Sequence, residues 1–299
     1  MKIFYLPWWF FKARILGIKR PLQTVLFITD QCNLACRHCV VYRFINPIIK
    51  SFQQIKEELE YSYRLGSRFV DFEGGEPTLW RDGDKDLNSL IRLSREIGFY
   101  SATITTNAFF PFAGSEADSI WVSLDGLGNY HDDIRGKGVF DRLVRHIETA
   151  NHPHISVNMV VNSRNYASVE ETIEFVKNNP HIQAISLNFH NPYPGTEDLF
   201  LDRETRGKII DLIIEKKKAG YPIMNSVSGL KMMKHSKFKK ECWVTNFILS
   251  DGRRLPECAG KSAGICDRCG LSMSGEMRSV FTLKPDTIFA GMKLRMQGK

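Results

Sequence analysis

Cysteines are the residues of this sequence best suited to chemistry, and they fall into two groups separated by about 200 residues without a cysteine. Three thiolates leave one coordination position of a metal or cluster open, as catalysis requires, whereas four complete a closed site. The sequence therefore predicts one open and one closed site. The first group is Cys32, Cys36 and Cys39, and the second is Cys242, Cys258, Cys266 and Cys269.

The number and context of the cysteines favour metal or cluster ligation over disulfides. Seven is odd, so the thiols cannot all pair within the chain. The apolar start is interrupted by basic residues and lacks a small-residue cleavage site, unlike a secretory signal peptide. We therefore expect the reducing cytoplasm, where cysteines bind metals or react more often than they cross-link.

The elements that must position the first group are alternating strands and helices. Six apolar, β-branched runs have helical patterns between most of them, which predicts a parallel sheet with helices outside it. Ser51 with Gln54 fits a capping box at one helix start, and Ser168 with Glu171 fits another. A closed barrel needs more units than six, so we expect an α/β fold with a partial, open βα barrel. The runs are 24–29, 69–73, 101–106, 119–124, 155–161 and 184–189.

The composition of the chain excludes several classes of protein. The chain has 299 residues, 43% hydrophobic and 25% charged, which excludes wholesale disorder or a fibrous chain. No uncharged apolar run reaches the ~18–20 residues of a membrane-spanning helix. The formal net charge of +8 suits anionic partners, but basic residues are spread along the chain and no nucleic-acid-binding motif is present. Nucleic acid is therefore not an expected partner.

Four motifs follow one another at the predicted strand ends. They are Cys32-Asn-Leu-Ala-Cys36-Arg-His-Cys39, Gly74-Gly75-Glu76-Pro77, Thr105-Thr106-Asn107, and Ser123-Leu124-Asp125-Gly126 followed by His131-Asp132-Asp133-Ile134-Arg135-Gly136. In this order they resemble the radical S-adenosylmethionine (SAM) superfamily, including the SLDG…Rg signature of its peptide-modifying and related branches. Ala108 departs from the family's TNG pattern. The resemblance covers about residues 22–220.

The resemblance implies two cofactors for the barrel. The first three cysteines would hold a [4Fe–4S] cluster whose open iron chelates SAM. Reductive cleavage of SAM would give a 5′-deoxyadenosyl radical that abstracts hydrogen from a substrate, and this step needs no acid–base residue. An electron donor such as flavodoxin or ferredoxin would be required.

The resemblance also implies a set of SAM-binding residues. Gly74 and Gly75 would let the backbone approach the ligand closely. His38 occupies the adenine-stacking position, and Arg135 suits a carboxylate through a bidentate contact. Taken singly, these residues also fit a tight turn, a solvated histidine and a surface arginine. The full set is His38, Gly74, Gly75, Glu76, Pro77, Thr106, Asn107, Ser123, Arg135 and Asn158.

The second cysteine group resembles the auxiliary-cluster extensions called SPASM and twitch domains, because it follows a radical SAM barrel. Four cysteines imply one extra [4Fe–4S] cluster, as in the smaller twitch type. Only Cys266 and Cys269 form a CxxC pair, so the spacing differs from that of paired zinc ribbons. Structural zinc and unligated thiols stay open as alternatives. A β-hairpin with its turn at Asp251-Gly252 is predicted among these cysteines.

The N-terminal segment is basic and aromatic, with no acid in the first 29 residues. Helical spacing from residue 8 places four large apolar side chains on one face. Two interpretations are open: the helix packs over the main domain, or it lies on an anionic membrane. The apolar face is Trp8, Phe11, Ile15 and Ile18. We divide the chain into this segment (1–21), the barrel (22–220) and a cysteine-rich, twitch-like module (221–299).

The substrate class stays open between two kinds. The SLDG…Rg signature and the auxiliary cysteines favour a peptide or protein. The N-terminal segment favours a lipid or other membrane-associated molecule at the inner face of the membrane, with a parallel in the radical SAM enzymes that build hopanoids. A rival of another class, a non-catalytic, basic, zinc-binding protein, is disfavoured because three cysteines make a poor structural zinc site.

Overall fold

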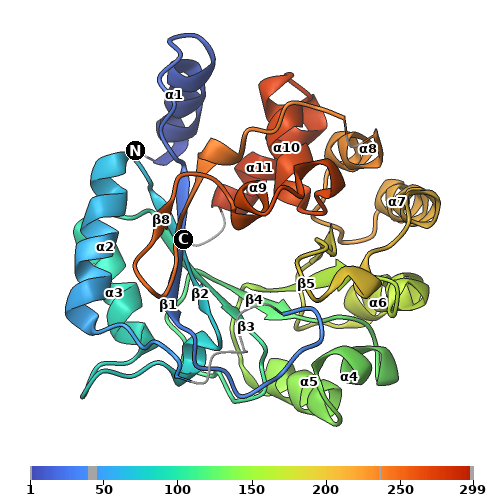
Figure 1. The fold of residues 1–299 in the computed structure, drawn as a ribbon, viewed down its shortest axis with the longest axis horizontal. Coiled ribbons are helices and arrows are strands. Elements are labelled where there is room, and N and C mark those ends of the chain that lie inside the picture. The colour runs from blue at the N-terminus through green and yellow to red at the C-terminus, as the bar shows by residue number, and fades with distance from the viewer. Residues whose placement is uncertain (1, 40–45, 236, 297–299) are drawn as a thin grey trace.

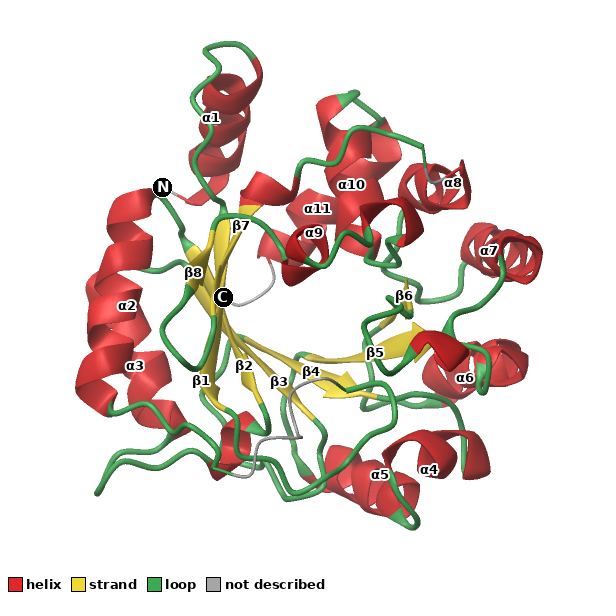
Figure 2. Ribbon diagram, in the orientation of Figure 1, coloured by secondary structure: helices red, strands yellow, loops and turns green. Residues whose placement is uncertain are grey.

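The centre of the molecule is one curved, mostly parallel sheet with helices around its outside (Figures 1 and 2). The computed structural model describes residues 2–39, 46–235 and 237–296. The six predicted strands run parallel in chain order, and the sheet does not close, which confirms the partial βα barrel. Its strands in spatial order are β6 (Ile185–Phe189), β5 (Ile155–Val161), β4 (Ser119–Ser123), β3 (Ser101–Thr106), β2 (Phe69–Gly74), β1 (Gln23–Thr29), β7 (Thr245–Ile248) and β8 (Arg254–Leu255).

The C-terminal region adds two strands to the barrel sheet. Strand β7 pairs in parallel with β1, and β8 pairs antiparallel with β7 through the predicted hairpin at Asp251-Gly252. The hairpin is therefore confirmed, but its addition to the barrel sheet is not something the sequence predicted. The division at residue 220 stays a prediction, and backbone hydrogen bonds connect the two parts across it.

Helices cover the outer face of the sheet because alternate strand residues are apolar and face them. Ile104, Val122 and Leu187 are buried in this layer. The residues between them are mostly polar and face the barrel interior. The helices are α1 (Lys2–Arg14), α2 (Phe52–Leu65), α3 (Leu87–Ile97), α4 (Asn129–Arg135), α5 (Val139–Thr149), α6 (Val169–Asn178), α7 (Arg203–Lys218), α8 (Val227–His235), α9 (Ala259–Ser262), α10 (Ser272–Phe281) and α11 (Pro285–Met296).

The two predicted helix caps have different outcomes. Helix α2 begins at the predicted capping box, in which Ser51 accepts from the Gln54 N–H and the Gln54 side chain accepts from the Ser51 N–H. The prediction for α6 is wrong, because a 3-10 turn already gives Ser168 helical backbone angles before the helix starts. The Ser168 hydroxyl instead donates to the Glu171 carboxylate.

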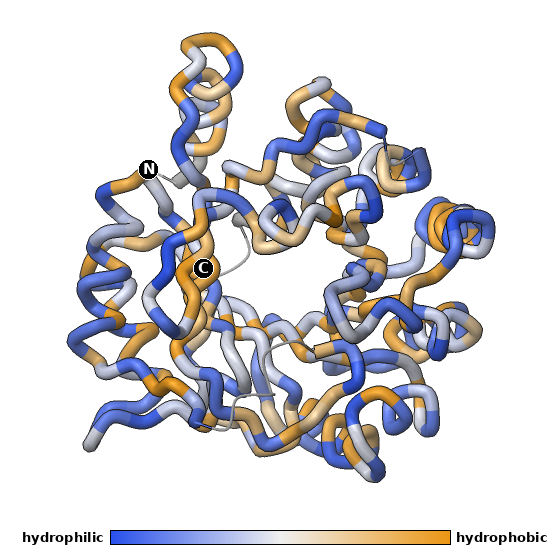
Figure 3. Tube along the Cα trace, in the orientation of Figure 1, coloured by the Kyte–Doolittle hydropathy of each residue, from blue (hydrophilic) through white to orange (hydrophobic). Residues whose placement is uncertain are grey.

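Helix α1 has one packed side and one exposed side. Trp9 and Ala13 are buried in a cluster with Phe281. The predicted apolar face is not the packed one, because Trp8, Phe11, Ile15 and Ile18 are exposed and the helix ends at Arg14. Figure 3 shows hydrophobic residues over much of this segment. Trp8 is 52% exposed and Phe11 is 42% exposed. Of the helices in the described ranges, none combines the length and the hydropathy needed to cross a bilayer.

Candidate active site

The first cysteine loop (residues 30–39) leaves the carboxyl end of β1. Cys36 is buried, and Cys32 and Cys39 are half-buried. The loop is closed by the Cys39 N–H, which donates to the Cys36 carbonyl at 3.1 Å. Burial raises the pKa of the Cys32 thiol and raises that of Cys36 to about 11. Because metal ligation requires thiolates, iron binding here must drive the release of those protons.

A buried ion pair stands beside this loop. Arg135 Nε donates to Asp125 Oδ2 at 2.7 Å, and Arg135 Nη1 lies 3.9 Å from Cys36 Sγ. Burial alone would raise the pKa of the Asp125 carboxyl, but the Arg135 charge and smaller contributions, which include the Val160 N–H, together outweigh burial and hold the pKa below its usual range. Asp125 Oδ1 also accepts from the Val160 N–H of β5. Arg135 is therefore a buried group of the site with its charge next to Cys36, and not a surface arginine.

Two side chains of the first cysteine loop have buried polar atoms without a partner among the described residues. They are His38 Nδ1 and Asn33 Nδ2. Burial lowers the pKa of His38 to about 4, so its ring is neutral at pH 7, with Nε2 3.8 Å from Asp125 Oδ2. Unsatisfied buried polar groups are costly and mark places where a ligand supplies the missing contact. The loop thus fits a polar ligand such as SAM.

The two glycines at the end of β2 allow the backbone there to approach the backbone after β1 closely. A Cβ atom on Gly74 would lie 2.2 Å from the Thr29 carbonyl oxygen, and one on Gly75 would lie 2.2 Å from that of Gln31. The Gly75 N–H donates to Thr29 O at 2.7 Å. These two residues therefore seat the end of β2 on the backbone that leads into the first cysteine loop.

Glu76 joins the ends of β2 and β3. Its buried carboxylate accepts from Thr106 Oγ1 and from the Asn107 N–H, each at 2.7 Å, and from Thr78. Asn107 Nδ2 in turn donates to Asn33 Oδ1 at 3.0 Å and lies 3.9 Å from Cys32 Sγ. Thr106 faces the helix layer, and Pro77 is buried at the start of a 3-10 turn. Glu76 and Thr106 thus position Asn107 against the cysteine loop.

Ser123 and Asn158 are neighbours in the sheet register on β4 and β5. Asn158 Oδ1 accepts from Asn188 Nδ2 of β6 at 2.6 Å, and both asparagines line the barrel cavity. Of the predicted set, His38 lies in the cysteine loop, and Asn107 and Arg135 lie against it. Asn158 lines the barrel cavity.

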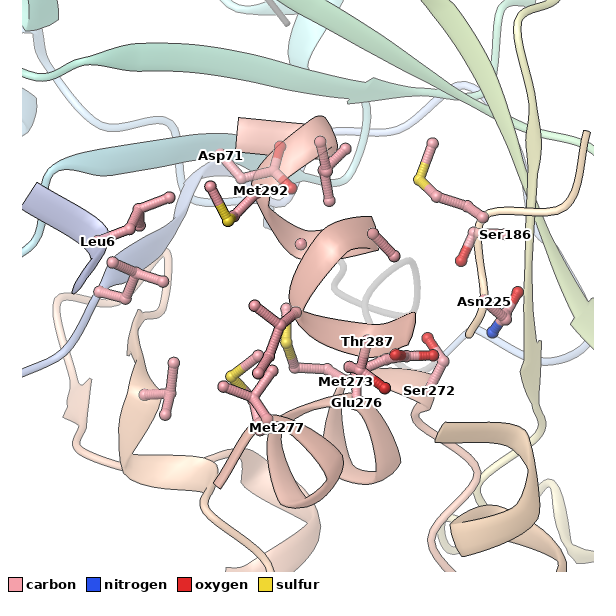
Figure 4. Close-up of a pocket in the computed structure, with 18 of the residues that line it drawn as sticks. Leu6, Asp71, Ser186, Asn225, Ser272, Met273, Glu276, Met277, Thr287 and Met292 are labelled. Atoms are coloured by element: carbon pink, nitrogen blue, oxygen red, sulfur yellow. The ribbon is translucent and has the colours of Figure 1, made fainter. Parts of the chain in front are cut away.

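The barrel cavity has a volume of about 520 Å³. Polar side chains from β2 to β6 form one wall, and α1, α10 and α11 form the other (Figure 4). Sequence reasoning missed the polar wall. Its signal was present, because parallel strands buried on both faces are usually apolar throughout, whereas these strands are polar at alternate positions. The missed residues are Asp71, Glu73, Thr105, Trp121, Ser186 and Asn188.

The second cysteine site is built around a small void next to the end of β6. Its four thiols are half-buried and line the void together with Asn191 and Tyr193. The loop is clamped to β6, because Phe189 N donates to Gly270 O at 2.8 Å and Gly270 N donates to Asn191 Oδ1 at 2.7 Å. The Cys242 and Cys258 thiols share a hydrogen bond, which lowers the pKa of Cys258 and raises the pKa of Cys242. Four thiols around one void fit a fully ligated cluster.

Comparison with known proteins identifies the family. A model of the radical SAM superfamily matches residues 26–176, half of the chain, and the chain belongs to this superfamily. The family implies SAM and a [4Fe–4S] cluster as cofactors, and the residues of the first cysteine loop fit both.

Individual relatives are more distant. Mycofactocin maturase MftC of Mycolicibacterium smegmatis is 29% identical over 162 residues, which cover 52% of this chain and 41% of that protein. Fe-coproporphyrin III synthase of Methanosarcina barkeri is 29% identical over 218 residues, covering 66% of this chain and 52% of that protein. The chain thus spans about half the length of these relatives. The crystal structure of Streptococcus suis SuiB bound to precursor peptide SuiA superposes with a TM-score of 0.66 at 19% identity, covering 90% of this chain and 69% of that one.

Proposed function

We propose that this protein reductively cleaves SAM and uses the resulting 5′-deoxyadenosyl radical to remove hydrogen from a peptide or protein. The observation that carries the proposal is the cysteine loop at the carboxyl end of β1, with the buried Arg135 3.9 Å from Cys36 and two polar atoms of the loop that have no partner among the described residues. Active sites of βα barrels lie at this end of the strands. A flavodoxin or ferredoxin would supply the electron.

The chain's own residues would bind, orient and shield. Cys32, Cys36 and Cys39 would hold the cluster, and His38 would face the adenine. Bound cluster and SAM would supply the radical chemistry. The network from Glu76 to Asn107 keeps the cysteine loop in place.

The second cysteine site would hold an auxiliary [4Fe–4S] cluster. Four thiols leave no open iron, so its role would be electron transfer or structure. Zinc is the alternative, and metal analysis of the anaerobically reconstituted protein separates the two. We expect about eight irons per chain with labile sulfide, and about half of that after Cys266→Ala with Cys269→Ala. One zinc without sulfide at this site would contradict the auxiliary cluster.

A peptide substrate is favoured by the relatives. SuiB was crystallised with its precursor peptide, and its fold covers most of this chain. The name of MftC likewise describes a maturase.

The test follows 5′-deoxyadenosine under anaerobic conditions with dithionite and SAM. The wild type should form it, and the triple variant Cys32→Ala, Cys36→Ala, Cys39→Ala should form none. The double variant Cys266→Ala, Cys269→Ala serves as the matched control, because it removes thiols but keeps the first loop. Equal product from the wild type and the triple variant would contradict the proposal.

A second candidate, a membrane-associated substrate, is favoured by one observation. Helix α1 exposes Trp8 and Phe11 beside Lys12, whose Nζ lies 4.8 Å from the Trp8 ring centroid, and α11 exposes Phe289 at 71%. Basic residues with exposed aromatic side chains are typical of helices that lie on anionic bilayers. The protein would then work at the inner face of the membrane.

Vesicle flotation tests this candidate. The protein should float with vesicles of phosphatidylcholine and phosphatidylglycerol and should not float with phosphatidylcholine alone. Trp8→Ser with Phe11→Ser should abolish flotation. The matched control, Phe110→Ser with Tyr166→Ser, removes two exposed aromatic rings elsewhere and should float like the wild type. No flotation of the wild type would remove the membrane from consideration.

A further inference from the structure

The barrel cavity has the opposite charge sign from the chain as a whole. The chain carries a formal net charge of +8. Three ionisable side chains line the cavity among the described residues, and all three are acids: Asp71, Glu73 and Glu276. No lysine, arginine or histidine is among the described lining residues. A cavity lined by charges of one sign favours a ligand of the other sign.

Two of the three acids form a pair on one strand. Asp71 and Glu73 are two positions apart on β2, so both side chains face the cavity. Their carboxyl groups hydrogen-bond to each other, and Thr105 Oγ1 lies 3.4 Å from Asp71 Oδ1. Burial, followed by the Asp71 charge, raises the pKa of Glu73 well above its usual range. A cation beside the pair would let both carboxyls ionise.

Glu276, the third acid, lies on α10 and is fixed by the start of α8. Its carboxylate accepts from the Ser226 N–H at 2.9 Å and from Ser226 Oγ at 2.6 Å. These bonds connect α10 to the start of α8. Glu276 therefore adds negative charge to the cavity from α10, and the Asp71–Glu73 pair adds it from β2.

The wall opposite the pair is apolar and adaptable. Helices α10 and α11 contribute Met273, Met277, Ile288 and Met292 (Figure 4). Methionine is unbranched and polarizable, so such a wall can accommodate chains of different shape. Figure 4 shows Asp71 of the polar wall and Met292 of the apolar wall around the same cavity.

We propose that the cavity binds a substrate group consisting of an organic cation on an apolar chain, with the ammonium or guanidinium held by Asp71 and Glu73 and the chain against the methionine wall. In a peptide this group is a lysine or arginine side chain. The inference deepens the proposed function, because it names the chemistry recognised at the same site. A metal ion fits less well, since two carboxyls against an apolar wall do not supply the about six to eight oxygen ligands of calcium.

The test uses the reconstituted protein with SAM and without reductant, so that no turnover is needed. Ligand-observed NMR measures the dissociation constants of n-hexylamine and n-hexanol, which differ only in the polar group. One charge-assisted hydrogen bond is worth about tenfold or more in affinity, so the amine should bind at least about tenfold tighter. Shortening the amine to butylamine should weaken binding, by about fourfold per methylene at full burial.

Two cavity variants and one control test whether Asp71 and Glu73 cause the preference for the amine over the alcohol. Glu73→Gln and Asp71→Asn keep the side-chain shape, and each should reduce the amine-over-alcohol preference about tenfold. Hexanol binding should stay unchanged and reports that the cavity is intact. The control Glu96→Gln makes the same chemical change on an exposed residue of α3 and should leave both affinities unchanged. Equal binding of amine and alcohol to the wild type, or a preference that survives both cavity variants, would overturn the proposal. A failure to form 5′-deoxyadenosine would contradict the proposed function alone, because this assay does not depend on it.

Discussion

The two cysteine sites each have one buried arginine, and the two arginines are held in different ways. Arg135, beside Cys36, is paired with the buried carboxylate of Asp125 at 2.7 Å. Arg206, beside the second site, donates to the Cys269 carbonyl at 2.9 Å and stacks over Phe189 with its Cζ 4.7 Å from the ring centroid. Among the described residues no carboxylate pairs with Arg206, whose Nε has no hydrogen-bond partner there, and burial lowers its pKa to about 10.

The difference separates a neutral site from a positive one. At the first site the Asp125 charge balances Arg135, so the arginine positions groups without adding net charge. At the second site the charge of Arg206 is balanced only when the thiols ionise. A cluster bound by four thiolates is anionic, and a buried cation next to Cys269 would stabilise it.

Removing each arginine tests the contrast most directly. Arg135→Met leaves the Asp125 carboxylate buried without its counter-ion, so we expect a loss of about 3–5 kcal/mol in the free energy of unfolding. Arg206→Met leaves no carboxylate without a counter-ion and should lower the free energy of unfolding by about 1–3 kcal/mol because hydrogen bonds are lost. Urea unfolding of the reconstituted proteins under anaerobic conditions measures both. Equal losses would show that the two arginines do not differ in the way that their contacts indicate.

The clamp on the second cysteine loop makes a prediction for that site alone. A Cβ atom on Gly270 would lie 1.9 Å from the Phe189 carbonyl oxygen, whereas one on Gly260 would be 3.4 Å from its nearest atom. Gly270→Ala should therefore cost about 1–3 kcal/mol from overpacking and lower the iron content by about half. Gly260→Ala is the matched control and should keep its iron. Full iron in both variants would mean that the second cysteines do not depend on this clamp.

The sequence predicted the strands that a local residue pattern specifies. It missed the features that depend on contacts between residues far apart in the chain. The strands at 101–106 and 155–161 match β3 and β5 residue for residue, because apolar alternation is a local signal. Strand β7 is only four residues long and pairs with β1 across more than 200 residues, so no local pattern announces it. Arg206 lies among other charged residues of α7, where composition favours an exposed face.

The glycine motif was correctly placed but incompletely explained. The sequence predicts that Gly74 and Gly75 allow the close approach of a ligand. In the structure they allow the close approach of the backbone of residues 29–31. The same sequence reasoning overlooked Asp71 and Glu73, because it treated the second strand as uniformly apolar. Polar residues at alternate positions of a parallel strand are the physical signal of a lined cavity, and they can be recognised without a structure.

A pH-dependent loss of stability is expected from the first site. His131 accepts from the Asp125 N–H, and burial, aided by the Arg135 charge, lowers its pKa to about 3. Below a pH of about 6.5 the unfolded chain therefore binds a proton that the folded chain does not. The free energy of unfolding consequently decreases as the pH is lowered. His131→Asn should remove about 2 kcal/mol of the loss between pH 7 and pH 5.

Urea unfolding at pH 7, 6 and 5 measures this slope. His152→Asn is the comparison, because burial also lowers the pKa of His152, which is only half-buried and lies away from the cysteine loop. Its effect on the slope should be smaller. Identical slopes for the wild type and His131→Asn would show that the buried imidazole does not contribute to the pH dependence.

The smallest effect concerns backbone strain, which also differs between the two sites. Ala108, next to Asn107, has a φ of +53°, whereas no described non-glycine residue between 242 and 270 has a positive φ. An alanine with left-handed backbone angles is strained by about 1 kcal/mol or more, and glycine removes this strain. Glycine also makes the unfolded chain more flexible, which offsets about 0.4–1 kcal/mol of the gain. Ala108→Gly should therefore be neutral or raise the free energy of unfolding by up to about 1 kcal/mol. Ala102→Gly, within β3 and without a positive φ, should lower it by about 1 kcal/mol. If both variants were destabilised equally, the departure from the family's glycine would carry no strain, and the first site would be as relaxed as the second.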